Sequence, residues 1–180
     1  GQVGSNVSFN TWTISGISKI TVNGNLITSG SRLGGFVGNI EPGDGTGNKV
    51  SFKTIKINGA TTINVTGDIT VGSHIGGFVG HGIGRSKDNT TVTMDDVTIT
   101  TPTITVSGAI KAGSYVGGFA GHLATACKLK DCKVTTSSTI TVGEINTATS
   151  YVGGAIANIQ GATGYPTTID GLTVPSPSVT

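Results

Sequence analysis

The sequence predicts an all-β chain, and within that class a parallel β-solenoid (β-helix) of about four ~40-residue repeats. A Ser-x-hydrophobic-Gly-Gly segment occurs four times, with its first glycine at Gly34, Gly76, Gly117 and Gly153, so that the spacings are 42, 41 and 36 residues. Self-similarity at such a period indicates stacked repeats. Val, Ile and Thr alternate between these segments, and helical periodicity is absent. A β-sandwich built from hairpins is the alternative.

The first element expected in each repeat is a strand, a sharp corner and a second strand. Its pattern is apolar-x-apolar-x-x-apolar-x-apolar, in which alternation on both sides of a polar pair predicts a corner between two strands. The apolar positions are Val7/Phe9/Trp12/Ile14, Val50/Phe52/Ile55/Ile57, Val92/Met94/Val97/Ile99, Cys127/Leu129/Cys132/Val134 and Thr167/Ile169/Leu172/Val174. The corner pairs are Asn10-Thr11, Lys53-Thr54, Asp95-Asp96, Lys130-Asp131 and Asp170-Gly171.

The second element is a short Ile-x-Val strand followed by a turn and another apolar residue. Ile and Val should face one side of this strand, and the residue between them should face the other side. The copies are Ile20-Thr21-Val22, Ile63-Asn64-Val65, Ile104-Thr105-Val106 and Ile140-Thr141-Val142.

The third element is the glycine pair. Glycine inside a strand marks a bend or a close approach of another backbone, so we expect the pairs to be structural. The pairs are Gly34-Gly35, Gly76-Gly77, Gly117-Gly118 and Gly153-Gly154. Phe36, Phe78 and Phe119 follow them and should form an aromatic stack that Ala155 ends. No helix follows the pair, which disfavours a dinucleotide-binding loop.

These elements divide the chain into one domain over residues 1–180. The expected repeats are approximately 7–49, 50–91, 92–126 and 127–166, with terminal strands at 167–174 and a tail at 175–180. Loops of variable length follow the Gly-Gly element, as is typical of repeats that carry insertions on one face. Both one and two coils per repeat are compatible with the spacing.

The chain also resembles a known repeat class. The segment from Tyr115 to Gly121, followed by Cys127 to Val134, resembles the GLUG-type Gly-Gly repeats of secreted and surface-anchored, often adhesin-like proteins. The resemblance covers most of residues 7–174. It implies a repetitive extracellular protein, and it supplies no catalytic residue.

Composition limits the remaining function classes. Charged residues make up 11% of the 180 residues and the net charge is +2, with no basic run that would favour nucleic acid. No apolar stretch reaches the ~18 residues of a transmembrane helix. The chain begins at Gly1, which predicts a processed product or an excised piece.

Histidines are the first candidate ligands. His81 and His122 occupy a repeat position that Asn39 and Asn158 fill in the other copies. Two imidazoles on adjacent strands could bind a metal, but the asparagines favour a ladder of hydrogen-bonded side chains, so we expect no metal and no other cofactor. His74 aligns with an arginine and two tyrosines, and we expect it to be exposed or at an interface.

Acidic residues offer weaker candidates. Asp95 and Asp96 are adjacent, as acid–base pairs can be, but they occupy a corner where other repeats have Asn-Thr or Lys-Thr. The segment 41–48 could offer oxygen atoms to calcium but lacks EF-hand spacing. We therefore expect no enzyme, and in particular no catalytic residue.

The two cysteines, Cys127 and Cys132, lie at core positions of one repeat. Either they are small hydrophobic residues or, if the corner between them turns sharply, they form a disulfide. An extracellular origin favours the disulfide, and this is the form we expect. Asn6, Asn64 and Asn89 each begin an Asn-x-Ser/Thr sequence and are candidate N-glycosylation sites.

The resulting hypothesis is a non-enzymatic extracellular or cell-surface structural protein that assembles head to tail into a fibre or adhesive stalk. Its partners would be copies of itself or further repeats of a longer chain. A glycan- or partner-binding adhesin module is the alternative, in which Tyr115, Tyr151, Tyr165 and Trp12 could contact a sugar. A carbohydrate-active enzyme and an ice-binding protein are weaker alternatives, the latter suggested by Thr103, Thr105, Thr139 and Thr141.

Overall fold

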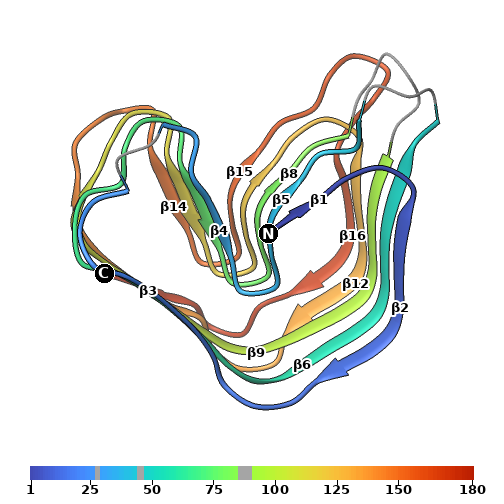
Figure 1. Ribbon diagram of the computed structural model, residues 1–180, viewed down its shortest axis with the longest axis horizontal. Helices are drawn as coiled ribbons and strands as arrows, with labels where there is room; N and C mark the ends of the chain where they lie inside the picture. Colours follow the sequence, from blue (N-terminus) through green and yellow to red (C-terminus); the bar gives the residue numbers. More distant parts are fainter. Residues whose placement is uncertain (27–28, 44–46, 85–90) are drawn as a thin grey trace.

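The computed structural model describes residues 1–26, 29–43, 47–84 and 91–180. Every regular element in these ranges is a β-strand, and the strands form three sheets (Figure 1). The largest, the outer sheet, contains β2 (Val7–Ile14), β3 (Ser18–Val22), β6 (Lys49–Val65), β9 (Thr91–Ile110), β12 (Cys127–Val134), β13 (Thr139–Ile145), β16 (Thr168–Thr173) and β17 (Ser178–Val179).

Two smaller sheets lie inside the curve of the outer sheet. One contains β4 (Arg32–Gly34), β7 (His74–Gly76), β10 (Tyr115–Gly117) and β14 (Tyr151–Gly153). The other contains β1 (Gln2–Val3), β5 (Val37–Ile40), β8 (Val79–Gly82), β11 (Ala120–Leu123) and β15 (Ile156–Ile159). Within the described part of the chain, no helix is long and apolar enough to cross a bilayer.

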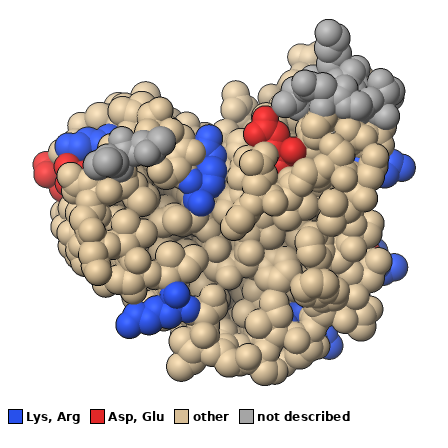
Figure 2. Space-filling view, in the orientation of Figure 1, with Lys and Arg blue, Asp and Glu red and all other residues tan. Residues whose placement is uncertain are grey.

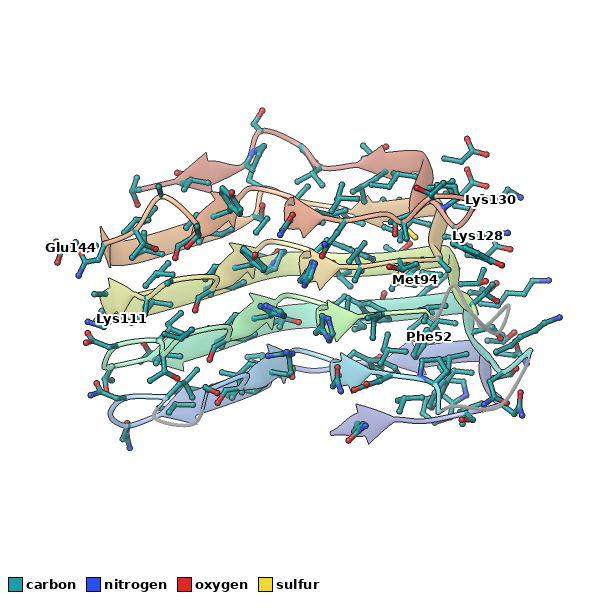
Figure 3. The ribbon with its side chains drawn as sticks, turned by 90° about the horizontal axis from the view of Figure 1, so that it is seen from above. Phe52, Met94, Lys111, Lys128, Lys130 and Glu144 are labelled. Carbon is teal, nitrogen blue, oxygen red and sulfur yellow. The ribbon has the colours of Figure 1, made fainter. Side chains whose placement is uncertain are left out.

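Strands of successive repeats pair in parallel, residue for residue. Phe9 lies beside Phe52, which lies beside Met94, and Ile20, Ile63 and Ile104 form a second such column (we call a set of residues in register on neighbouring strands a column). Figure 3 shows the repeats as layers one above another. Because the strands hydrogen-bond from one layer to the next, equivalent residues of the interior repeats share similar surroundings.

The predicted fold class is wrong, both as a β-solenoid and as the alternative β-sandwich. The outer sheet bends into a half-barrel, and the other two sheets fold back into its hollow, so that the outline has two lobes with a notch between them (Figures 1 and 2). The prediction was a stack of β-solenoid coils, with either one or two coils per repeat. Instead the path turns inward at the glycine pair, and the strands surround two cores. The named strand pairs are all parallel, which is not the hairpin pairing of the predicted sandwich.

One core fills each lobe. The first is built around Phe52, Phe78 and Phe119, and the second around Ile63, Ile104 and Val116. In the first core Phe78 stacks on Phe36 with ring centroids 5.2 Å apart and on Phe119 at 5.4 Å, as the repeat pattern predicts. Aromatic side chains of this size dominate the energetics of a core.

The glycine pair makes the inward turn possible. A Cβ at Gly76 would overlap the carbonyl oxygen of Val79, which follows the reversal, while a Cβ at Gly77 would overlap the carbonyl oxygen of Gly118 in the next repeat. Pro102 of the outer sheet closes the other side of Gly77. The turn therefore touches the outer sheet directly and separates the two cores. The expectation of a bend with close backbone approach is confirmed.

The corners of the outer sheet also agree with the sequence pattern. The second residue of every predicted corner pair has a positive φ, namely Thr11 (56°), Thr54 (53°), Asp96 (55°), Asp131 (50°) and Gly171 (81°). A non-glycine residue in this region is uncommon, and its recurrence at one repeat position identifies a built corner. Asp95 lies in the corner column between Lys53 and Lys130, which supports its structural role.

Candidate functional site

Three histidines meet where the two inner sheets face each other. His74 begins β7, His81 lies in β8 after the glycine turn of the same repeat, and His122 lies in β11 of the next repeat. Each offers one ring nitrogen, and these three atoms all lie within 4.8 Å of one another. The side chains are 5%, 9% and 8% exposed, respectively.

Register and the glycine turn together create this cluster. His122 lies beside His81 in one direction and Asn158 in the other, while His81 also lies beside Asn39. The repeat alignment predicts this column correctly. The turn at the glycine pair then brings β7 against β8, and with it His74 to His81, at a ring-centroid distance of 5.0 Å. The expectation that His74 is exposed or at an interface is wrong, because the alignment does not show that its strand packs against β8.

Tyrosines extend the cluster along the stack. The ring of Tyr115 stacks on His74 with centroids 4.8 Å apart and meets His122 edge-on at 5.1 Å. Tyr151 stacks on Tyr115 at 5.5 Å. These planar neighbours restrict the rotation of His74 and give the site one rigid wall.

The hydrogen-bond partners of the imidazoles are few. Nδ1 of His81 lies 2.8 Å from Oδ1 of Asn39, whereas both ring nitrogens of His122 and Nδ1 of His74 are buried without a hydrogen bond. The Gln160 side chain interacts with His122 and the Gly113 backbone with His74, and each raises the pKa of its histidine. Unpaired buried nitrogen atoms are costly, so this arrangement calls for a ligand or a functional reason.

Electrostatics keep these rings neutral. Burial, followed by the positive charge of Arg32 and then neighbouring imidazoles, lowers the pKa of His74 to about 2. Burial and Arg32 likewise lower the pKa of His81 to about 3 and that of His122 to about 4. A neutral imidazole has a free lone pair, which is the form that binds metals.

Arg32 is the charged neighbour of the site. It lies beside His74 on the next strand, and its Nη1 donates a 2.6 Å hydrogen bond to the carbonyl of Gly72. Burial lowers its pKa, while the charge of Glu41 raises it. Figure 2 shows a basic side chain on one wall of the notch and an acidic one on the other.

The predicted disulfide is wrong, because Cys127 and Cys132 are both free and buried. The corner at Asp131 places the thiols in separate columns, where each bonds a different carbonyl: Sγ of Cys127 lies 3.3 Å from the oxygen of Gly82, and Sγ of Cys132 lies 3.4 Å from that of Met94. Burial raises the pKa of Cys127 to about 12 and that of Cys132 to about 11. Both cysteines therefore act as core residues.

The three glycosylation candidates differ in setting. Nδ2 of Asn6 donates a 2.9 Å hydrogen bond to Asn48, so a glycan there would replace a contact between repeats. Asn64 is half-buried, in the column of Thr21 and Thr105 as predicted. Asn89 lies outside the described residues. Glycosylation of all three stays a prediction.

A separate hollow lies where strands β9, β12 and β16 begin. Its volume is about 470 Å³, and Lys128, Tyr165 and Pro166 contribute to its lining. It lies on the C-terminal side of the array, away from the three histidines, and offers an aromatic ring beside a cation.

Comparison with known proteins finds no match to this chain. No family model, curated protein or solved structure matches it. The resemblance to GLUG-type repeats therefore stays a prediction.

Proposed function

We propose that this protein is a non-enzymatic structural repeat protein of the extracellular space or cell surface, which extends end to end with a second copy or with further repeats of the same pattern. The observation that carries the proposal is that the described strands at both ends of the stack have a partner strand on one side only. Among the described strands, β2 and β3 pair only with β6 on one side, and β16 and β17 pair only with β12 and β13.

Both faces expose apolar side chains. Trp12 is 47% exposed on the first face, while Tyr151, Ile169 and Val179 are 45%, 39% and 45% exposed on the last. Unpaired strand edges with apolar side chains promote pairing with another chain. Charged residues such as Lys19 and Asp170 are few on these faces, so little repulsion opposes contact.

The two faces also match each other. Ile169 ends the column that Phe9 begins, and Val179 ends the column that Ile20 begins. If β16 of one copy paired with β2 of the next, both apolar columns would continue unbroken. Such a head-to-tail contact does not close and builds a fibre.

Sedimentation velocity over a range of concentrations, together with electron microscopy, tests this proposal. We expect rods whose length grows with concentration. Ile169→Lys should leave monomers, because the charge would lie within the apolar column at the contact between copies. Val71→Lys is the control and should still form rods, because Val71 is exposed on a turn away from both end faces. A wild-type chain that stays monomeric at every concentration would contradict the proposal.

A second candidate function is glycan binding at the hollow beside Tyr165. An aromatic ring next to Lys128 could stack on a sugar ring and bind its hydroxyl groups. A glycan array tests this role: binding that Tyr165→Ala abolishes would favour it, and an array without hits would exclude it. The ice-binding alternative gains no support, since Lys19 and Asn64 interrupt the threonine columns.

A further inference from the structure

The histidine cluster has the composition of a metal site. Three imidazole nitrogens, one from each of His74, His81 and His122, lie within 4.8 Å of one another. In a tetrahedral zinc site with Zn–N bonds of about 2.0–2.1 Å, ligand nitrogens lie roughly 3.3 Å apart. Metal binding would therefore draw the three ring nitrogens together by up to about 1.5 Å.

Asn39 and Glu41 orient one of these ligands. Nδ2 of Asn39 donates to a carboxylate oxygen of Glu41 at 3.3 Å, so its Oδ1 faces His81. An amide oxygen only accepts, and Nδ1 of His81 must therefore carry the proton. Nε2 of His81 then keeps its lone pair. A carboxylate or carbonyl that fixes the tautomer of a histidine in this way is the usual outer support of a metal ligand.

The other two ligands are held ready but unpaired. Both nitrogens of His122 and Nδ1 of His74 are buried without a hydrogen bond, while Tyr115 packs against both rings. A purely structural ladder would satisfy these nitrogens, as Asn39 satisfies His81. A metal ion would supply the missing partner for lone pairs on both rings.

We propose that His74, His81 and His122 bind one divalent transition metal of the zinc class, with the fourth coordination position left to water or a small anion. Imidazole suits zinc, copper and nickel, whereas calcium and magnesium need oxygen ligands. The ligands come from two successive repeats, so the ion would join the second repeat to the third across the glycine turn. This inference does not depend on the proposed fibre.

Arg32 opposes the cation and also suggests what accompanies it. Its charge acts on all three imidazoles. A guanidinium beside a metal disfavours a second positive charge but favours an anion at the open position. The site should therefore bind metal more tightly in the Arg32→Gln variant. In that variant the metal affinity should also depend less on the concentration of an anion such as chloride.

The first experiment is a titration of the metal-free chain at neutral pH with Zn²⁺ by calorimetry, and with Co²⁺ by visible absorption. We expect one ion per chain, with intense cobalt bands that indicate four- or five-coordination, and a rise in thermal stability with zinc. Mg²⁺ and Ca²⁺ should have no effect. The affinity order should follow Mn²⁺ < Zn²⁺ < Cu²⁺.

The repeats supply matched variants that preserve the fold. His122→Asn and His81→Asn place the residue found at the same position in other repeats, and His74→Tyr does the same with Tyr115 as the precedent. Each should lower zinc affinity by more than the roughly 10–100-fold expected for loss of the supporting Asn39 in Asn39→Ala. Asn158→Ala, in the same column but outside the cluster, should leave affinity unchanged.

Two results would overturn the proposal. One is a folded wild-type chain that binds neither Zn²⁺ nor Co²⁺. The other is binding that survives all three histidine substitutions, which would assign the ion to another part of the surface. Circular dichroism of each variant verifies that lost binding does not reflect unfolding, and because the readout is metal affinity, fibre formation does not enter it.

Discussion

At the scale of single residues, three neutral histidines in one cluster are the least expected feature of this chain. The sequence places His81 and His122 in one column correctly, because repeat alignment reports register directly. It misses His74, because alignment cannot show that two columns on different strands face each other. The sequence does carry a usable signal: His74 lies two residues before the glycine pair and His81 four residues after it, on the two arms of one turn.

Acid should destabilise the metal-free chain through these residues. Their folded pKa values, about 2 to about 4, lie below the unfolded value of 6.5. The unfolded chain therefore binds more protons below pH 6.5, so the histidines' contribution to stability is complete above that pH and is lost as the pH falls toward the folded values. Each proton contributes a slope of up to about 1.4 kcal/mol per pH unit.

Denaturant unfolding between pH 7 and pH 4, with a chelator present, measures this slope. His122→Asn should reduce the slope, because one of the three groups no longer titrates. Lys56→Gln, which removes an exposed charge from β6, is the control and should keep the wild-type slope over this range. Equal slopes in wild type and His122→Asn would contradict the prediction.

At the scale of elements, the sequence predicts the strands and corners well. Alternating apolar residues around a polar pair define the arms of the outer sheet, and the positive φ at each second corner residue agrees with that pattern. The glycine pair is also recognised as a bend. The direction of the bend is not predicted, because a glycine indicates only that another group approaches the backbone closely and does not identify that group. What approaches is Pro102 or Thr61 of the same chain's outer sheet, far away in sequence.

Gly77→Ala tests the importance of this contact. An added Cβ would overlap the backbone of Gly118 and press on Pro102, and neither can give way without separating the inner and outer sheets. We expect the free energy of unfolding to fall by about 3 kcal/mol or more, which is the upper end of the range for overpacking. Gly4→Ala, where no atom lies within 4 Å of the added Cβ, is the control and should change little. Thermal and denaturant unfolding measure both.

At the scale of the whole molecule, the sequence spacing between paired strands follows from the sequence, but the two-lobed outline does not. Period and register are local properties of a pattern, whereas the outline depends on which way each repeat turns at Gly34, Gly76, Gly117 and Gly153. A chain with the same period could enclose one core or two. Only the packing of the glycine turn against the outer sheet decides between them.

Amide hydrogen exchange should show a gradient from the middle repeats to the end faces. Strands β6 and β9 have partners on both sides, whereas β2, β3, β16 and β17 have a partner on one. We therefore expect the slowest exchange in β6 and β9. If copies stack end to end, concentrated samples should protect the end strands as well. Uniform protection at low concentration would contradict the gradient.

The parallel columns have a mechanical consequence. Hydrogen bonds between repeats run along the stacking direction, so a pull along that axis loads successive interfaces in series, each carrying the whole force. Strength is then set by the weakest interface, and the tightest one adds nothing. A crosslink between the second and third repeats, such as an ion held by His74, His81 and His122, would strengthen that interface. The stack would then break at another interface.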